Sequence, residues 1–446
     1  MNTPSGGSPA EVAQRTRRVL GDVTDLPELV ACYEDLHRHP ELSGRETRTS
    51  ALIAERLMAT GARVTTGIGG TGVAGILANG DGPVVMLRAD MDALPVQERT
   101  GFAYASTATA EGADGNPVPV MHACGHDVHM AALLGTIGAL ARARDQWRGT
   151  IMAVAQPAEE TAEGAVAMLR DGLFRRFGRP DVALAQHVDA FGVGQIGHRA
   201  GLFASGAVNV DITIRGRGGH GASPEVCIDP IIVATLIVLR LQTVVARELE
   251  PTEPAVVTVG MLHAGTKANV IPDEARLALN LRFRSEETRQ KLLDAVDRIV
   301  TGECRSARCP DEPTIRPSAY FPLTRNDESV TAAIRGVHEE LFGVPNVVDL
   351  PVSMGSEDFS IFGIPDPEDG YTGPAVPYCY WEFGGYATQA WQEAAGQTFA
   401  EKRNALPGCH SAAFGPQALG AIRTGLVALT GGALAFLAPV EERRLP

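Results

Sequence analysis

The stretch Val120–His129 limits what this chain can fold into and do more than any other part of its sequence. It reads VMHACGHDVH, so one thiol and three imidazoles occur within ten residues. Cys124 and His126 can face one ion in a tight turn, whereas His122, His126 and His129 can share one face of a helix. Each buried imidazole needs hydrogen-bond partners, so such a cluster is costly without a ligand. A metal ion binds thiolate and neutral imidazole together, so we expect a metal site; a polar loop around a buried structural cysteine is the alternative.

Length and composition indicate a globular protein of more than one domain, because 446 residues exceed the size at which a single core keeps growing. The formal net charge is -14 and no Lys/Arg run occurs, which argues against nucleic acid and anionic membranes as partners. Seven scattered cysteines do not resemble a disulfide framework. A reducing cytoplasm is therefore the expected location.

The two ends of the chain carry no predicted targeting or membrane-spanning segment. Met1–Ala10 is rich in Gly, Ser and Pro without an apolar stretch after a basic start, and is predicted to be disordered. Gly425–Pro439 is strongly apolar but shorter than a membrane span. We expect it to be a buried helix.

Strand and helix patterns alternate along the first two hundred residues. A helix is expected after Ser43, a candidate N-cap with Glu46 three residues later. Further helical patterns occur at 28–39, 130–147 and 163–171, and short apolar runs predict strands at 72–77, 83–87, 150–155 and 181–185. This alternation predicts a doubly wound α/β sheet with its chemistry at the carboxyl ends of the strands.

Polar side chains follow three of these strands. Asp90 and Asp92 come after the second, Glu159 and Glu160 after the third, and His187 after the fourth. Taken singly, they can be turn formers, charges at a helix N-terminus and a core histidine. Together with the cysteine and histidines of the first stretch, they converge on one sheet edge and predict an active site.

The pattern changes between residues 204 and 323. Strands and helices are expected there in the order βαββαβ, which is the ferredoxin-like arrangement, at 208–214, 229–247, 255–262, 276–283, 286–300 and 314–321. We therefore expect a lid or dimerisation domain at 204–323, inserted into a catalytic domain formed by 1–203 and 324–446.

Three polar residues of the inserted domain are candidates for substrate contact. His220 lies in the glycine-dense loop Gly216–Pro224, which lacks both the Lys-Ser/Thr of a P-loop and the spacing of a dinucleotide fingerprint. It is either a surface residue or a substrate contact. Asn269 follows, and Arg282 at a strand end suits a carboxylate clamp, although an exposed arginine is the commoner case.

These motifs, taken in order, resemble the M20 family of zinc-dependent metallopeptidases. The resemblance is to its amidohydrolase branch, which includes hippurate hydrolases, aminoacylases and hydrolases of indole-acetyl amino-acid conjugates. It covers nearly the whole length, through His37–Glu41, Arg88–Pro95, Met121–Asp127, Gln156–Glu160, Gly218–Ala222, Asn269–Asp273, Gly355–Phe359 and His410–Ser411.

The resemblance implies a di-metal peptidase-type catalytic domain, with a mixed sheet flanked by helices, beside the ferredoxin-like lid. It implies two divalent ions, Zn²⁺ by preference and Mn²⁺, Co²⁺ or Ni²⁺ as alternatives, bound by Cys124, His126, Glu160, His187 and His410. Cys124 would stand where other branches have a bridging carboxylate, and Glu159 matches the general base. The chain departs from the branch at two positions. Cys409 stands where Asn is common, and Ala412 where Pro is common.

The remaining roles are also implied by the resemblance. Asp90, Asp92 and Asp127 are expected to orient metal-binding imidazoles. His220, assisted by Asn269, is expected to stabilise the tetrahedral oxyanion, often across a dimer interface, while Arg282 binds the substrate carboxylate. A homodimer or higher homo-oligomer through the lid domain follows.

The expected function is hydrolysis of N-acyl-L-amino acids to a carboxylic acid and a free amino acid. A dipeptidase or carboxypeptidase of the same family is the first alternative. A second makes Cys124 a nucleophile paired with His126 and acting without metal. A non-enzymatic metal-binding interaction module is the remote alternative, because metal binding alone needs no spare glutamate.

Overall fold

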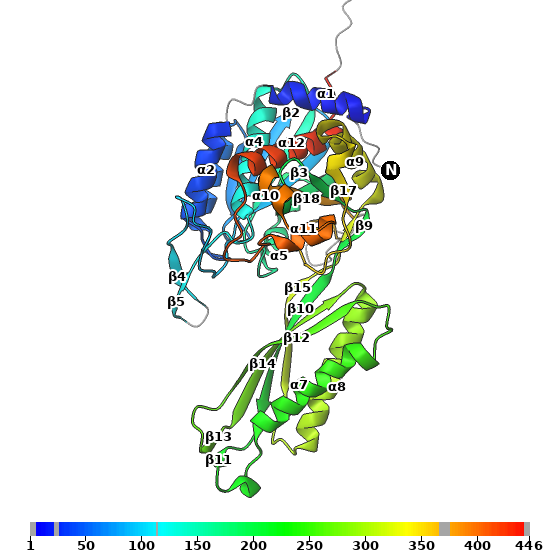
Figure 1. The fold of residues 1–446 in the computed structure, drawn as a ribbon. Helices are drawn as coiled ribbons and strands as arrows, with labels where there is room; N and C mark the ends of the chain where they lie inside the picture. Colours follow the sequence, from blue (N-terminus) through cyan, green and yellow to red (C-terminus); the bar gives the residue numbers. More distant parts are fainter. Residues whose placement is uncertain (1–5, 22–25, 113–114, 365–374, 441–446) are drawn as a thin grey trace, which may run out of the picture. The chain divides into compact units, whose positions relative to one another are not determined.

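The computed structural model describes residues 6–21, 26–112, 115–364 and 375–440. The chain forms two compact units, which are described separately (Figure 1). The first comprises 1–203, 325–351 and 358–446, and the second comprises 204–324 and 352–357.

A mixed eight-stranded sheet forms the centre of the first unit, in the strand order β1-β2-β6-β3-β7-β18-β8-β17. Its inner strands β6, β3, β7 and β18 run parallel, while β2 and β8 join it antiparallel. The bounds are Arg63–Ile68, Gly72–Asn79, Gly149–Gln156, Val84–Asp90, Val182–Gly192, Tyr378–Tyr386, Ile196–His198 and Val347–Asp349 in sheet order. The parallel strands are almost wholly buried, which explains their continuous apolar runs. The predicted α/β class with a mixed sheet is confirmed.

Helices cover this sheet and supply the rest of the core. Long helix α12 (Ala418–Phe436) packs on α4 (His126–Arg142), and a Cβ at Gly135 would lie 2.2 Å from Leu426, so the glycine permits their close approach. The other helices of this unit are α1 (Pro9–Leu20), α2 (Leu26–Arg38), α3 (Thr47–Ala59), α5 (Gly164–Arg170), α6 (Leu173–Phe177), α9 (Glu328–Phe342), α10 (Thr388–Glu393) and α11 (Phe399–Ala405). A short strand pair of this unit is formed by β4 (Thr109–Glu111) with β5 (Pro117–Pro119). Another pair, β9 (Gly201–Ala204) with β16 (Thr324–Asn326), includes the residues at which the chain passes from one unit to the other.

Among the described residues, two helices are long and apolar enough to cross a membrane by length and composition alone, α12 and α7 (Pro230–Arg247). The expectation that the apolar C-terminal segment is too short was wrong, because α12 has 19 residues and begins before Gly425. Its most apolar window is 78% buried, so its hydrophobicity is that of a core helix.

Two local predictions near the N-terminus were wrong. Residues 9 and 10 are not disordered, because they open α1, which Ser8 and Glu11 cap with a reciprocal capping box; residues 1–5 lie outside the described residues. Ser43 does not cap α3, which begins at Thr47 with no side-chain cap bond. Its hydroxyl donates instead to Asp92 Oδ2 at 2.7 Å.

The second unit is a four-stranded antiparallel sheet in the order β12-β14-β10-β15, with helices α7 and α8 packed on it and on each other. Its elements are β10 (Gly206–Arg215), α7, β12 (Ala255–Ala264), β14 (Glu274–Phe283), α8 (Glu286–Ser306) and β15 (Thr314–Phe321). This confirms the βαββαβ arrangement. A small β11–β13 ladder (Gly219–His220 with Val270–Ile271) stands at one end of the unit (Figure 1).

Candidate metal centre

The turn that carries Cys124 lies immediately before α4. Gly125 caps the helix in the left-handed region, at a φ of 78°, and a Cβ there would lie 2.4 Å from Val188 Cγ1. Only glycine fits both constraints. His126 is the first residue of the helix, so the turn places the thiol and the imidazole beside the same space.

Five predicted donors converge in the first unit. Cys124 Sγ lies 3.4 Å from His187 Nε2 and 3.3 Å from His410 Nε2. Glu160 Oε1 lies 3.3 Å from His410 Nε2 and 3.9 Å from His126 Nε2. Residues nearly three hundred positions apart in the sequence thus present sulfur, nitrogen and oxygen donors to one another.

Unsatisfied buried atoms show that these donors fit a cation. Both ring nitrogens of His126 and the Oε1 of Glu160 are buried, and within the described part of the chain they make no hydrogen bond. Such atoms are costly to bury unless a ligand satisfies them. The donor set of thiolate, imidazole and carboxylate is the one that Zn²⁺ and similar divalent ions prefer.

The charge around His126 also favours a cation. Burial by itself lowers the pKa of His126, but the carboxylates of Asp90, Asp92 and Glu160 raise it to about 10. The imidazole therefore holds a proton near neutral pH when no other cation is bound. A divalent ion satisfies the same carboxylates and leaves the ring neutral, as a ligand must be.

Asp90 and Asp92 both lie close to His126, but Asp90 makes its shortest contact with His129. Asp90 Oδ1 lies 2.6 Å from His129 Nδ1, and His129 Nε2 accepts a hydrogen bond from the Val188 amide at 2.8 Å. Both nitrogens of His129 are therefore engaged, which leaves it a supporting role next to His187. Asp92 Oδ1 lies 3.3 Å from His126 Nδ1 and can orient that ring.

Asp127 orients an imidazole outside the five donors. Its Oδ2 lies 2.6 Å from His37 Nδ1, and His37 Nε2 lies 3.0 Å from Glu98 Oε1. Burial by itself lowers the pKa of His37, but the two carboxylates raise it to about 9. The sequence did not point to Glu98, because nothing near it in the chain marks it as a partner of His37.

The raised pKa of His37 predicts a pH-dependent stability. The protonated ring stabilises the fold fully below about pH 6.5, and this contribution, about 3 kcal/mol, is lost as the pH rises through about 9. The free energy of unfolding of the first unit, measured from pH 6 to 10, should therefore fall in the wild type and fall less in His37→Gln. The neighbouring His39→Gln, at an exposed position, is the control and should retain the wild-type slope.

The loop that carries Glu159 and Glu160 is held from both sides. Glu46 Oε1 accepts a hydrogen bond from the Ala158 amide at 2.9 Å, and Asp92 Oδ2 accepts one from the Glu160 amide at 3.0 Å. Ala158 adopts a φ of 48°, which is rare for a residue with a side chain. These bonds hold the backbone on either side of Glu159, whose side chain is only 6% exposed and which directly precedes the metal-binding candidate Glu160. The spacing from Ser43 predicted a capping role for Glu46, whereas its side chain positions this loop.

The second unit brings His220 and Asn269 together, but not with Arg282. The Gly221 amide donates to the Asn269 carbonyl at 2.9 Å, and His220 pairs with Val270 in the β11–β13 ladder. The β10–β14 register places this loop beyond the pair Arg215–Glu274, whereas Arg282 pairs with Ala207 at the other end. Eight residues of strand separate the two ends, which is roughly 26 Å.

Arg282 is held in place by its neighbours. Its Nη1 donates to the Met354 carbonyl at 2.5 Å, and its Nε donates to Asn280 Oδ1 at 2.9 Å. The guanidinium is thus held by groups of the second unit.

A large part of the sequence also matches a family of known proteins. Residues 86–380 match peptidase family M20/M25/M40. The chain belongs to this family. The predicted resemblance is confirmed, and this M20 protein is an amidohydrolase.

Relatives and solved structures of the M20 family match most of its length. The IAA-amino acid hydrolase ILR1-like 2 of Arabidopsis thaliana is 34% identical over 386 residues, covering 82% of this chain and 85% of that protein. The hippurate hydrolase of Campylobacter jejuni is 35% identical over 348 residues, covering 77% and 87%. A solved Bacillus subtilis protein, described as a dinuclear metal-binding peptidase of the M20 family, is 27% identical with a TM-score of 0.67, covering 93% and 100%.

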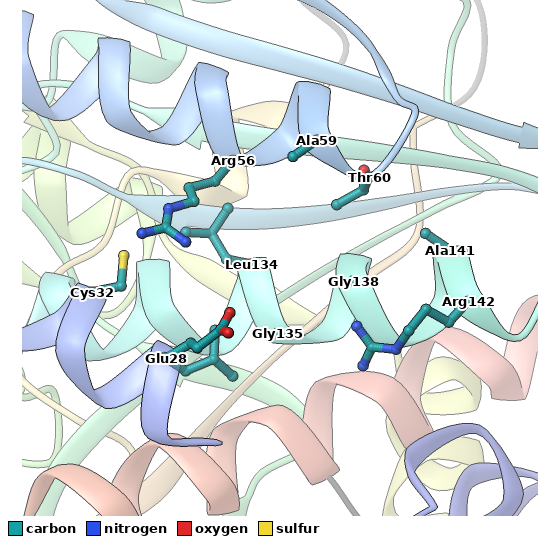
Figure 2. Close-up of a pocket in the computed structure, with 11 residues that line it drawn as sticks. Glu28, Cys32, Arg56, Ala59, Thr60, Leu134, Gly135, Gly138, Ala141 and Arg142 are labelled. Carbon is teal, nitrogen blue, oxygen red and sulfur yellow. The ribbon is translucent and has the colours of Figure 1, made fainter. Parts of the chain in front are cut away.

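A hollow of about 410 Å³ lies elsewhere in the first unit of this M20 protein, among α2, α3 and α4 (Figure 2). Charged residues Glu28, Arg56 and Arg142 line it together with Cys32 and Leu134. None of the five candidate metal donors lines this hollow. It is therefore separate from the chemistry described above.

Proposed function

We propose that this M20 enzyme hydrolyses the amide bond of N-acyl-L-amino acids, releasing a carboxylic acid and an amino acid, at a centre of two divalent ions. The observation that carries the proposal is the convergence of five donors, together with the buried Glu159 that precedes one of them in the sequence. The donors are Cys124, His126, Glu160, His187 and His410. Relatives named for hydrolysis of IAA-amino acids and of hippurate support this substrate class. Zn²⁺ suits the cysteine and histidine donors best, with Mn²⁺, Co²⁺ or Ni²⁺ as alternatives.

The residues of the chain divide the chemistry between them. When bound, the two ions lower the pKa of the attacking water and polarise the amide carbonyl. Glu159 takes the proton of the water and later delivers it to the leaving amine. His126 is oriented by Asp92, and Glu160 is held through its backbone amide by the same carboxylate. In the second unit, Arg282 binds the substrate carboxylate, while His220 and Asn269 stabilise the oxyanion.

The proposed substrate class is tested by comparing three substrates. N-benzoylglycine should be cleaved with a kcat/KM at least about tenfold above that of a plain dipeptide. The reason is that the charged α-amine of a dipeptide would have to lose its water at the position that binds the acyl group. N-benzoylglycinamide, which lacks the carboxylate proposed to pair with Arg282, should lose about 10- to 100-fold. A dipeptide cleaved faster than every N-acyl amino acid tested would instead identify a dipeptidase. Liquid chromatography of the released amino acid or amide measures all three.

The second unit offers a surface for dimerisation. Ile232, Leu236 and Leu239 recur along one side of α7 and are 58%, 47% and 62% exposed. Strand β12 lies at the edge of the sheet and exposes Met261 and Leu262. An apolar stripe beside an open strand edge is typical of a surface that a second copy covers. We include a homodimer through this unit in the proposal, and the cytoplasm as its location because all seven cysteines are free thiols.

A dimer would resolve the separation of His220 from Arg282. About 26 Å of strand separates His220 from Arg282 within one chain. The two residues of a single chain therefore cannot both contact one small substrate. We therefore propose that the partner subunit supplies His220 to each site. Only a mixed assembly can then combine an intact Glu159 with an intact His220.

Mixing two inactive variants tests this sharing. Glu159→Gln and His220→Ala chains, unfolded and refolded together, should recover about a quarter of wild-type activity, because one site of each mixed dimer is intact. Adding Leu239→Glu to both chains should abolish both the dimer, by light scattering, and the recovery. The control Met58→Glu, at an exposed apolar position of the first unit, should alter neither. Mixed dimers without activity would refute the sharing.

A further inference from the structure

Cys409 precedes the proposed ligand His410 and carries a thiol that the proposed reaction does not use. Its Sγ, the Sγ of Cys124 and a ring nitrogen of His187 all lie within 4.8 Å of one another. Cys409 Sγ also lies 3.6 Å from the carbonyl oxygen of Val188, the residue after His187. Two sulfurs and one imidazole thus surround a single point of the first unit.

The backbone holds Cys409 in this place. The His410 amide donates to the Ala123 carbonyl at 2.8 Å, which ties the loop to the residue before Cys124. His410 itself adopts a φ of 68°, a conformation that residues with side chains rarely adopt. The result is that two consecutive side chains, Cys409 and His410, both reach Cys124.

Two overlapping groups of donors share Cys124. One is Cys124, His187 and Cys409, and the other is Cys124, His126 and Glu160, each within 4.8 Å. The second group has Glu160 as an anionic donor of its own. In the first group, Cys409 is the anionic donor besides the shared Cys124. The adjacent His129 is not available as a ligand, because Asp90 and Val188 engage both of its nitrogens.

We propose that Cys409 is a further metal ligand, which binds as a thiolate the ion held by Cys124 and His187. The proposal rests on the two-ion centre described under the proposed function. Each thiol releases its proton to solvent as the metal–sulfur bond forms, so no oxidant is needed. Thiolates favour Zn²⁺ over Mn²⁺, so Cys409 gives this position of the centre a preference for zinc.

X-ray absorption at the zinc edge tests the proposal on the wild-type chain. With Cys124 bridging and Cys409 bound, the spectrum should show about 1.5 sulfur neighbours per zinc at about 2.3 Å, against about 1.0 if Cys124 alone supplies sulfur. A value near 1.0 in protein that holds two zinc ions overturns the role of Cys409 and leaves the two-ion centre intact. A value near zero, or failure to bind two ions, overturns the centre as well.

Variants give an independent readout. In reduced, cobalt-loaded protein, Cys409→Ser and Cys409→Ala should keep two ions but lose part of the thiolate-to-cobalt absorption, and chelator competition should show one zinc bound about tenfold or more weakly. Cys309→Ser, a half-buried thiol of the second unit, is the control and should match the wild type. Unchanged absorption and zinc affinity in both Cys409 variants overturn the proposal. The proposal is also overturned if mass spectrometry detects a Cys124–Cys409 disulfide that persists in the metal-loaded wild type under reducing conditions.

Discussion

Glu159→Gln should retain two metal ions per chain and lose about 10²- to 10⁴-fold in kcat on N-benzoylglycine. Glutamine keeps the shape of the side chain but accepts no proton from the attacking water. The metal donors are unchanged, so metal content measured by mass spectrometry should equal that of the wild type. Intact metal binding together with lost turnover would show that Glu159 transfers a proton and does not bind the metal.

Glu163→Gln is the matched control for this prediction. It removes a carboxylate from the same loop, four residues further on and exposed to solvent. Its kcat should stay within about twofold of the wild type, because an exposed charge of this kind contributes little. Turnover that survives in Glu159→Gln would show that another group carries the proton, and the assignment would then be wrong.

Removal of the metal should abolish hydrolysis and lower the stability of the first unit. Dialysis against a chelator should reduce kcat/KM by more than about 10²-fold, because no cation remains to polarise the amide or lower the pKa of water. Stoichiometric Zn²⁺ should restore it. Ions present at about 1,000 times their dissociation constant stabilise the fold by about 4 kcal/mol, so the Tm of the first unit should fall on removal.

The same experiment decides the role of Cys124. If Cys124 were a nucleophile paired with His126, metal-free protein would remain fully active. The distances favour ligation, because the thiol lies 3.3–3.4 Å from two further imidazoles, His187 and His410. Full activity in protein verified to be metal-free would contradict the metal mechanism.

The sequence was a good guide to elements whose pattern is local. The apolar runs predicted β2, β3 and β6, and the βαββαβ order of the second unit, because buried strands and amphipathic helices impose their own periods. It was a poor guide where tertiary contacts replace local ones. Ser43 has the residue spacing of a helix cap, yet its hydroxyl contacts Asp92, a residue forty-nine positions away.

By itself, the sequence predicted which residues carry the chemistry. The clustered Cys124 and His126, the paired Glu159 and Glu160 and the motifs around them are short and specific, and they led to the family that the comparisons confirm. Only the tertiary structure decided how these residues are combined. In the folded chain, Asp90 contacts His129 and Asp127 contacts His37. His220 and Arg282 lie a strand's length apart, and Cys409 lies beside Cys124. The physical reason is that a set of metal ligands depends on the distances between side chains. For residues hundreds of positions apart, these distances are set only when folding closes the long loop of chain between them.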